Sequence, residues 1–196
     1  MKYLGFLFCL LSLATGLSAE EWTAEELSAA NTASHAVFMT SQERDVVKYV
    51  NLARLYPRKF IRVEVEGYEL PSNYVRSATF ESYRQSLIDT LQARQPVAAV
   101  VPDEAMFLMA RKWAVESGEA GLCGHDRSMS EAQFGGECCS YGWNDARRIV
   151  LSLLIDDGVE SLGHRIICLS PNYSKLGVSN EAHKMYRYCS VLDFIW

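Results

Sequence analysis

The chain has 196 residues, of which 49% are hydrophobic and 22% are charged, and its formal net charge is −5. That length and composition predict one well-packed domain and exclude general disorder. The acidic balance, without a run of lysine and arginine, excludes the electrostatic footprint of a nucleic-acid-binding protein.

The first nineteen residues, MKYLGFLFCLLSLATGLSA, have the pattern of a secretory signal peptide. Lys2 precedes an apolar run over 4–13, and small residues end the stretch. The run is shorter than the roughly 20 residues that span a bilayer, so we expect no transmembrane anchor. We therefore divide the chain into a signal peptide (1–19), an N-terminal leader (20–40) and one folded domain (41–196), exported to the periplasm or the extracellular space.

Cleavage of the signal peptide leaves an odd number of cysteines. The five that remain are Cys123, Cys138, Cys139, Cys168 and Cys189. In an oxidising compartment we expect disulfide bonds among them, with at least one cysteine left over and the connectivity open. No CxxC pair is present, which excludes a zinc ribbon.

The first half of the chain predicts a loose leader followed by two helices. Residues 20–40 are polar and rich in alanine. Thr40 and Glu43 have the spacing of a capping box, and apolar residues then recur on one helical face as far as Pro57. Residues 62–78 mix strand and turn residues and are interpreted as irregular. A second helical stripe occupies 80–91 and ends before Pro96.

The second half predicts helices, long loops and a terminal hairpin. A short extended run at 97–101 precedes a third helix that begins near Asp103, and Asn144 is expected to cap a fourth helix that ends near Gly158. Glycine-rich loops over 118–142 and 158–172 separate these elements, and strands are predicted at 175–179 and 185–195 with a turn at 180–183. Helices followed by a hairpin indicate an α+β domain.

Histidines and one acid stand out in the two predicted loops. His125 and Glu137 fall in the first loop, and His164 falls in the second. In the stretch GGECC (135–139) we expect the glycines to permit a tight turn, and a cysteine to tie the loop to Cys123 or to a strand cysteine, so that Glu137 stays aimed at the histidines.

Seven short motifs follow one another in a recognisable order. They are ERDVVKYVNLARLYP (43–57), GH (124–125), GGE (135–137), LLIDDG (153–158), SLGHR (161–165), SPNYSKLGV (170–178) and VLDF (191–194). This order resembles the CAP superfamily of cysteine-rich secretory, antigen 5 and pathogenesis-related proteins, and in particular the SCP-like secreted proteins of bacteria. The resemblance covers about 43–194, with 62–96 as an insertion.

The resemblance implies a three-layer α-β-α sandwich with a central antiparallel sheet. It also implies a cleft that holds two histidines and two acids and often binds a divalent cation such as zinc. His125, Glu137 and His164 match three of these four residues. Cys138 stands where the family has asparagine, and the second acid has no clear counterpart, although Asp156, Asp157 and Glu160 lie near His164.

These three residues permit several functions. Two imidazoles and a carboxylate suit Zn²⁺ or another divalent cation and leave an open coordination position. The first hypothesis is a secreted, non-enzymatic module whose cleft binds a metal ion or a ligand such as a lipid, a peptide or a surface protein. The second is a zinc-dependent hydrolase with Glu137 as general base. The third is a structural envelope protein in which the three side chains form a hydrogen-bonded network without metal.

Overall fold

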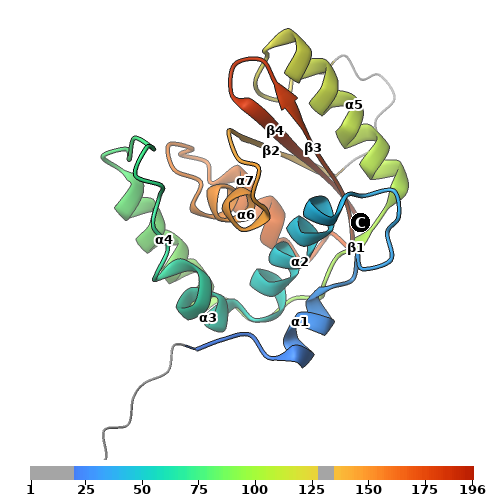
Figure 1. Ribbon diagram of the computed structural model, residues 1–196. Helices are drawn as coiled ribbons and strands as arrows, with labels where there is room; N and C mark the ends of the chain where they lie inside the picture. Colours follow the sequence, from blue (N-terminus) through green and yellow to red (C-terminus); the bar gives the residue numbers. More distant parts are fainter. Residues whose placement is uncertain (1–19, 128–134) are drawn as a thin grey trace, which may run out of the picture.

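Residues 20–127 and 135–196 are described by a computed structural model, and they form a four-stranded sheet between two layers of helix (Figure 1). The predicted signal peptide lies outside the described residues. The helices are α1 (Ala24–Ala30), α2 (Ser41–Leu55), α3 (Pro57–Phe60), the π-helical turn η1 (Ile61–Val65), α4 (Phe80–Ala93), α5 (Glu104–Ala120), α6 (Ala146–Ile155) and α7 (Gly163–Leu169). The strands are β1 (Val101–Pro102), β2 (Gly136–Tyr141), β3 (Lys175–His183) and β4 (Arg187–Ile195).

The sheet is mixed, with the strand order β1-β3-β4-β2. β4 pairs antiparallel with both β2 and β3, and Glu137 lies directly opposite Asp193 in this register. The short β1 pairs parallel with β3, so the sheet is not purely antiparallel as the resemblance implied. The predicted α+β class and three-layer arrangement are confirmed, and β2 is left as an edge strand.

The two helical layers cover opposite faces of the sheet. α5 packs along β3 and β4 on one face, whereas α2, α6 and α7 pack on the other (Figure 1). A Cβ atom added at Gly177 of β3 would lie 2.0 Å from the backbone nitrogen of Phe107, so this glycine lets α5 approach β3 closely. The larger core cluster lies on the side of α2, α6 and α7, and a smaller one around Trp113 lies beneath α5.

The N-terminal segment is more ordered than predicted. Residues 24–30 form α1, and Ala30 and Ala33 are fully buried against the core, so 20–40 is not a loose leader. The capping box of Thr40 and Glu43 is present as predicted at the start of α2. Pro57 ends that helix and immediately begins α3 at a position where its missing N–H is harmless.

Several predicted boundaries shift in the C-terminal half. Asp103 caps α5 as expected, but the side chain that caps α6 is Asp145, not Asn144, and α6 ends at Ile155, ahead of Gly158. In the terminal hairpin, β3 ends at His183 and β4 begins at Arg187. The turn therefore lies at 184–186 and not at the predicted 180–183. Among the described residues, no helix combines the length and apolarity needed to cross a membrane.

Candidate functional site at the sheet edge

Glu137 lies on the edge strand β2 and not in a loop. Alternate side chains of a strand share a face, so Glu137 and Cys139 both point toward the α5 side, while Cys138 points toward the opposite layer. Gly136 is the first residue of β2, so it does not form the predicted tight turn. A Cβ atom at Gly135 would lie 2.4 Å from the Tyr173 ring, so this glycine is required by close packing.

His125 lies in the segment that directly follows α5. Two hydrogen bonds fix the backbone of the preceding residue, Gly124. Its carbonyl accepts a hydrogen bond from Trp113 Nε1 (3.1 Å), and its N–H donates to the Tyr141 hydroxyl (2.8 Å). Gly124 has a φ of 94°, which a residue with a side chain rarely adopts. These constraints place the His125 imidazole beside β2, with 53% of its side chain exposed.

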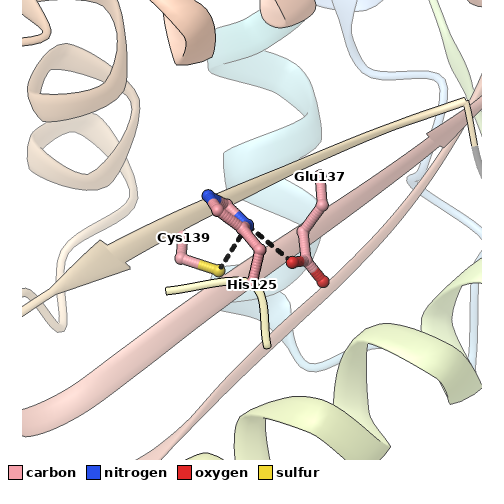
Figure 2. A group of neighbouring side chains, drawn as sticks. All are labelled: His125, Glu137 and Cys139. Carbon is pink, nitrogen blue, oxygen red and sulfur yellow. Dashed lines mark hydrogen bonds and ion pairs between the residues drawn. The ribbon is translucent and has the colours of Figure 1, made fainter. Parts of the chain in front are cut away.

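His125 and Glu137 are in direct contact. The Nδ1 atom of His125 lies 2.7 Å from Oε1 of Glu137, which is almost fully buried (Figure 2). This hydrogen bond raises the pKa of His125 above its ordinary value, with desolvation acting in the opposite direction. A carboxylate bonded to Nδ1–H fixes the tautomer and leaves the other ring nitrogen, Nε2, with a free lone pair.

The buried side chain of Arg127 contacts the carboxylate of Glu137. The guanidinium of Arg127 forms ion pairs with Glu137 and with Asp193, the latter at 2.6 Å, and all three side chains are almost fully buried. Two carboxylates directly opposite each other on neighbouring strands would repel, and Arg127 offsets this repulsion. Burial nevertheless raises the pKa of Asp193 to about 7, against the lowering effect of its hydrogen bond with Arg127.

His164 lies at the start of helix α7, where a loop was predicted. Its Nδ1 atom is 2.7 Å from Oδ1 of Asp156, and its backbone N–H donates to Oδ2 of the same carboxylate at 3.0 Å. Asp156 is buried and ends α6 in the left-handed conformation, with φ at 60°. Of the three acids near His164 in the sequence, Asp156 is therefore the one that holds this histidine.

The two histidines face a common cleft of about 360 Å³. Their ring centroids are 6.0 Å apart, so the structure brings His125 and His164 together although they come from opposite helical layers. Cys139 and Asp156 also line the cleft, and Trp143 and Tyr74 form part of its wall. Glu137 is not among the lining residues, because it lies behind His125.

Three donor atoms at this site are close enough to hold a metal ion. They belong to His125, Glu137 and Cys139 and lie within 4.8 Å of one another (Figure 2). The sulfur of Cys139 is 3.9 Å from His125 Nδ1. The sequence predicted Cys139 as a disulfide candidate and not as a metal ligand. Its position two residues after Glu137 was the available signal that both side chains share one face of a strand.

The expected disulfides are not formed among the described residues, in which all five cysteines are free thiols. Cys138 and Cys139 point to opposite faces of β2, so the first meets Cys168 of α7, with the two sulfurs 3.9 Å apart, and does not reach Cys123. Burial raises the pKa of the Cys138 and Cys139 thiols well above the ordinary value. Neither is therefore an activated nucleophile in this state.

Sequence reasoning missed Arg127 and Asp193, which support Glu137. The sequence did contain a signal for Asp193. It stands at every second position with Cys189 and Val191, so all three side chains share one buried face of β4. A carboxylate at such a position needs a partner. Nothing in the sequence indicates that the partner is Arg127, which is 66 residues away.

Solved structures similar to this chain include two surface or secreted proteins of bacteria. No family model matches the chain, and no curated protein does. An outer surface protein from Borrelia burgdorferi is similar at 16% identity, over 61% of this chain and 94% of that one, with a TM-score of 0.40. A cysteine-rich secretory protein from Staphylococcus aureus is similar at 14% identity, over 68% of this chain and 47% of that one, with a TM-score of 0.38. The second is named for the family that the motifs resemble. Likeness at this level leaves activity to be inferred from the site itself.

Proposed function

We propose that this is a secreted, non-enzymatic binding protein whose cleft holds a divalent cation through His125, His164 and Glu137. The observation that carries the proposal is the pair of imidazoles that face one cleft, each held by a buried carboxylate at 2.7 Å. Metal-binding histidines characteristically donate their second ring N–H to a carboxylate, which fixes the ring and increases its basicity.

The spacing of the two rings suits a shared ion. With their centroids 6.0 Å apart, the two imidazoles can approach one cation from opposite walls of the cleft. Three or fewer protein ligands leave a coordination position for water or for an incoming ligand. The aromatic wall of Trp143 and Tyr74 next to the histidines supports an organic ligand, such as a lipid, a peptide or an exposed segment of a surface protein.

The surroundings of Glu137 favour binding over hydrolysis. One carboxylate oxygen is bonded to His125, and the other is paired with Arg127. A general base must reach a substrate water and take its proton, whereas this carboxylate is buried behind His125 and already engaged. Glu137 is better suited to orient His125 or to bind a cation beside it.

Export completes the proposal. Residues 1–19 direct secretion, their removal leaves a mature chain that starts just before α1, and the whole of 41–196 forms the binding domain. The mass of the protein recovered from the periplasm or the culture medium tests this part, because loss of the first 18 or 19 residues is expected.

The cation is tested by calorimetric titration of zinc into the mature protein. We expect saturable binding at one site per chain, lost in both His125→Ala and His164→Ala. His35→Ala is the matched control, because His35 is exposed and lies outside the cleft. Absence of binding in the wild type, or binding that neither cleft variant changes, would contradict the proposal and favour a structural network of histidines.

A further inference from the structure

We infer that Cys139 supplies a thiolate to this site, so that the ion is held by His125 Nδ1, a Glu137 carboxylate oxygen and Cys139 Sγ. The cation is then of the zinc class and not of the calcium or magnesium class. This inference rests on the proposed function, because it keeps the cation at His125 and Glu137, names its metal class and replaces His164 with Cys139 as the third protein donor.

The geometry of the three donors is close to that of a zinc site. Bond lengths of about 2.0–2.1 Å to nitrogen or oxygen and about 2.3 Å to sulfur give tetrahedral ligand separations of about 3.3 Å and 3.6 Å. The observed separations are 2.7 Å between Nδ1 and Oε1 and 3.9 Å between Nδ1 and Sγ. An ion would therefore require the nitrogen–oxygen separation to widen by about 0.6 Å and the nitrogen–sulfur separation to shorten by about 0.3 Å, while the oxygen–sulfur separation lies within 4.8 Å.

The backbone supplies two donors in a fixed relation. Glu137 and Cys139 are two residues apart on β2, whose pairing with β4 runs through both positions. Their side chains thus point in the same direction without any rearrangement of the loop. Only His125 is carried by a loop, and its half-exposed ring is the donor with freedom to adjust.

The charges around the site explain why a thiolate is needed. Glu137 is already paired with Arg127, whose positive charge disfavours a cation nearby, and Asp193 balances Arg127 from its other side. A thiolate adds a negative charge directly at the ion. The Cys139 thiol donates a weak hydrogen bond to the Gly124 carbonyl at 3.7 Å. On binding, the S–H proton leaves to solvent and the sulfur lone pair coordinates the metal. His125 also loses its Nδ1 proton to solvent and takes up a proton at Nε2, so that Nδ1 presents its lone pair to the ion.

The donor set selects the metal. A nitrogen, a sulfur and a single carboxylate suit borderline-soft ions such as Zn²⁺ and Co²⁺, whereas Ca²⁺ takes six to eight oxygen ligands and Mg²⁺ takes an octahedron of oxygens. Two of the three donors, His125 and Cys139, line the cleft, and the ring of His164 lies 6.0 Å from the ring of His125.

Cobalt spectroscopy on the mature protein, kept reduced with a phosphine, tests the inference. Cobalt bound by a thiolate gives a sulfur-to-metal charge-transfer band in the near ultraviolet. We expect this band in the wild type and its loss in Cys139→Ser. Zinc affinity should then fall by at least the roughly 10- to 100-fold that changes around a metal's ligands cause. Cys189→Ser is the matched control, because Cys189 is also buried on the α5 side but offers no donor to the cluster.

The outcomes separate this inference from the proposed function. Cobalt binding without the band, unchanged in Cys139→Ser and lost in His164→Ala, would overturn the thiolate and leave the two-histidine cleft in place. Binding with the band that is retained in His164→Ala supports the thiolate and overturns His164 as a ligand of the ion. Absence of any zinc or cobalt binding would overturn both. Because the wild-type spectrum requires no variant, a failure of Cys139→Ser to fold does not remove the test.

Discussion

The two histidine–carboxylate pairs of the cleft have the same hydrogen-bond length but different surroundings. Asp156 accepts three hydrogen bonds, two from backbone N–H groups at the start of α7 and one from His164. Glu137 instead lies between His125, an arginine and a cysteine sulfur. One carboxylate joins two helices, and the other belongs to a charged cluster. The comparison indicates that Asp156 mainly maintains the fold, whereas Glu137 mainly serves the site.

The largest expected effect on stability comes from removing the positive charge of Arg127, which supports Glu137. Arg127→Leu would leave Glu137 and Asp193 buried and facing each other. Breaking a buried ion pair in this way costs about 3–5 kcal/mol, so urea unfolding should show a large loss of stability. Arg111→Leu is the control, because Arg111 is mostly exposed in its ion pair with Glu181 and such pairs contribute about 1 kcal/mol or less. Equal losses in the two variants would contradict the importance of the buried cluster.

The second largest effect tests whether Asp156 maintains the fold. Asp156→Ala removes the acceptor for two backbone N–H groups and for His164, and it places alanine at a positive φ. We expect a loss of about 2–3 kcal/mol in the free energy of unfolding. Asp157→Ala, one residue further on, provides the control. It removes only side-chain hydrogen bonds to Ser77 and Thr79 at exposed positions, so its effect should be smaller.

This difference between the pairs shows what a sequence can and cannot predict. The capping box of Thr40 and the helical stripe at 80–91 were predicted correctly, because both depend on residues within one or two turns. Glu137 was predicted in a loop because of the glycines before it, yet Gly135 is required by the Tyr173 ring, 38 residues away. Contacts of that range decide whether a glycine marks a turn or a close approach.

The site shows the same limit. His125, Glu137 and His164 were selected from motifs, and the first two prove to be in contact while His164 lies across the cleft. Their supports were not visible in the sequence, because Arg127 and Asp193 are 66 residues apart and Asp193 lies opposite Glu137 through the pairing of β4 with β2. The start of α7 gave no signal either, because its N-cap residue is Leu162, in the left-handed conformation and without a capping side chain, and Asp156, eight residues before His164, binds the backbone N–H groups instead.

A smaller effect concerns pH and the charged cluster. The pKa of Asp193 rises from an ordinary 3.8 to about 7, so between these values the folded state retains a proton that the unfolded state has lost. Stability from this group is therefore full below about pH 4, falls as the pH rises through about 7 and is constant above it. Arg127 and Glu137 are the charged groups that face it. The raised pKa of His125 acts in the same direction.

Asp193→Asn isolates that contribution. Other carboxylates also titrate at low pH, so the quantity to compare is the difference in urea midpoint between wild type and variant at pH 4.5 and at pH 7.5. We expect the wild type to lose its advantage over Asp193→Asn as the pH rises. A difference that grows with pH would mean that Arg127 keeps Asp193 ionised and that burial does not dominate.

The smallest effect on stability and the sharpest test of the comparison come from Glu137→Gln. The amide keeps the size of the side chain and can still accept a hydrogen bond from His125, while Arg127 retains Asp193 as its partner. The variant also removes the repulsion between Glu137 and Asp193, so the free energy of unfolding should change by only about 1 kcal/mol or less. Zinc affinity, in contrast, should fall about 10- to 100-fold or more, because an amide is a poor ligand and a weaker partner for a metal-bound imidazole. Asp156→Asn is the counterpart at the other histidine, with stability expected to suffer more than zinc affinity. If Glu137→Gln lost stability and kept its zinc, the roles of the two carboxylates would be reversed, and the cation would have to lie on the side of His164.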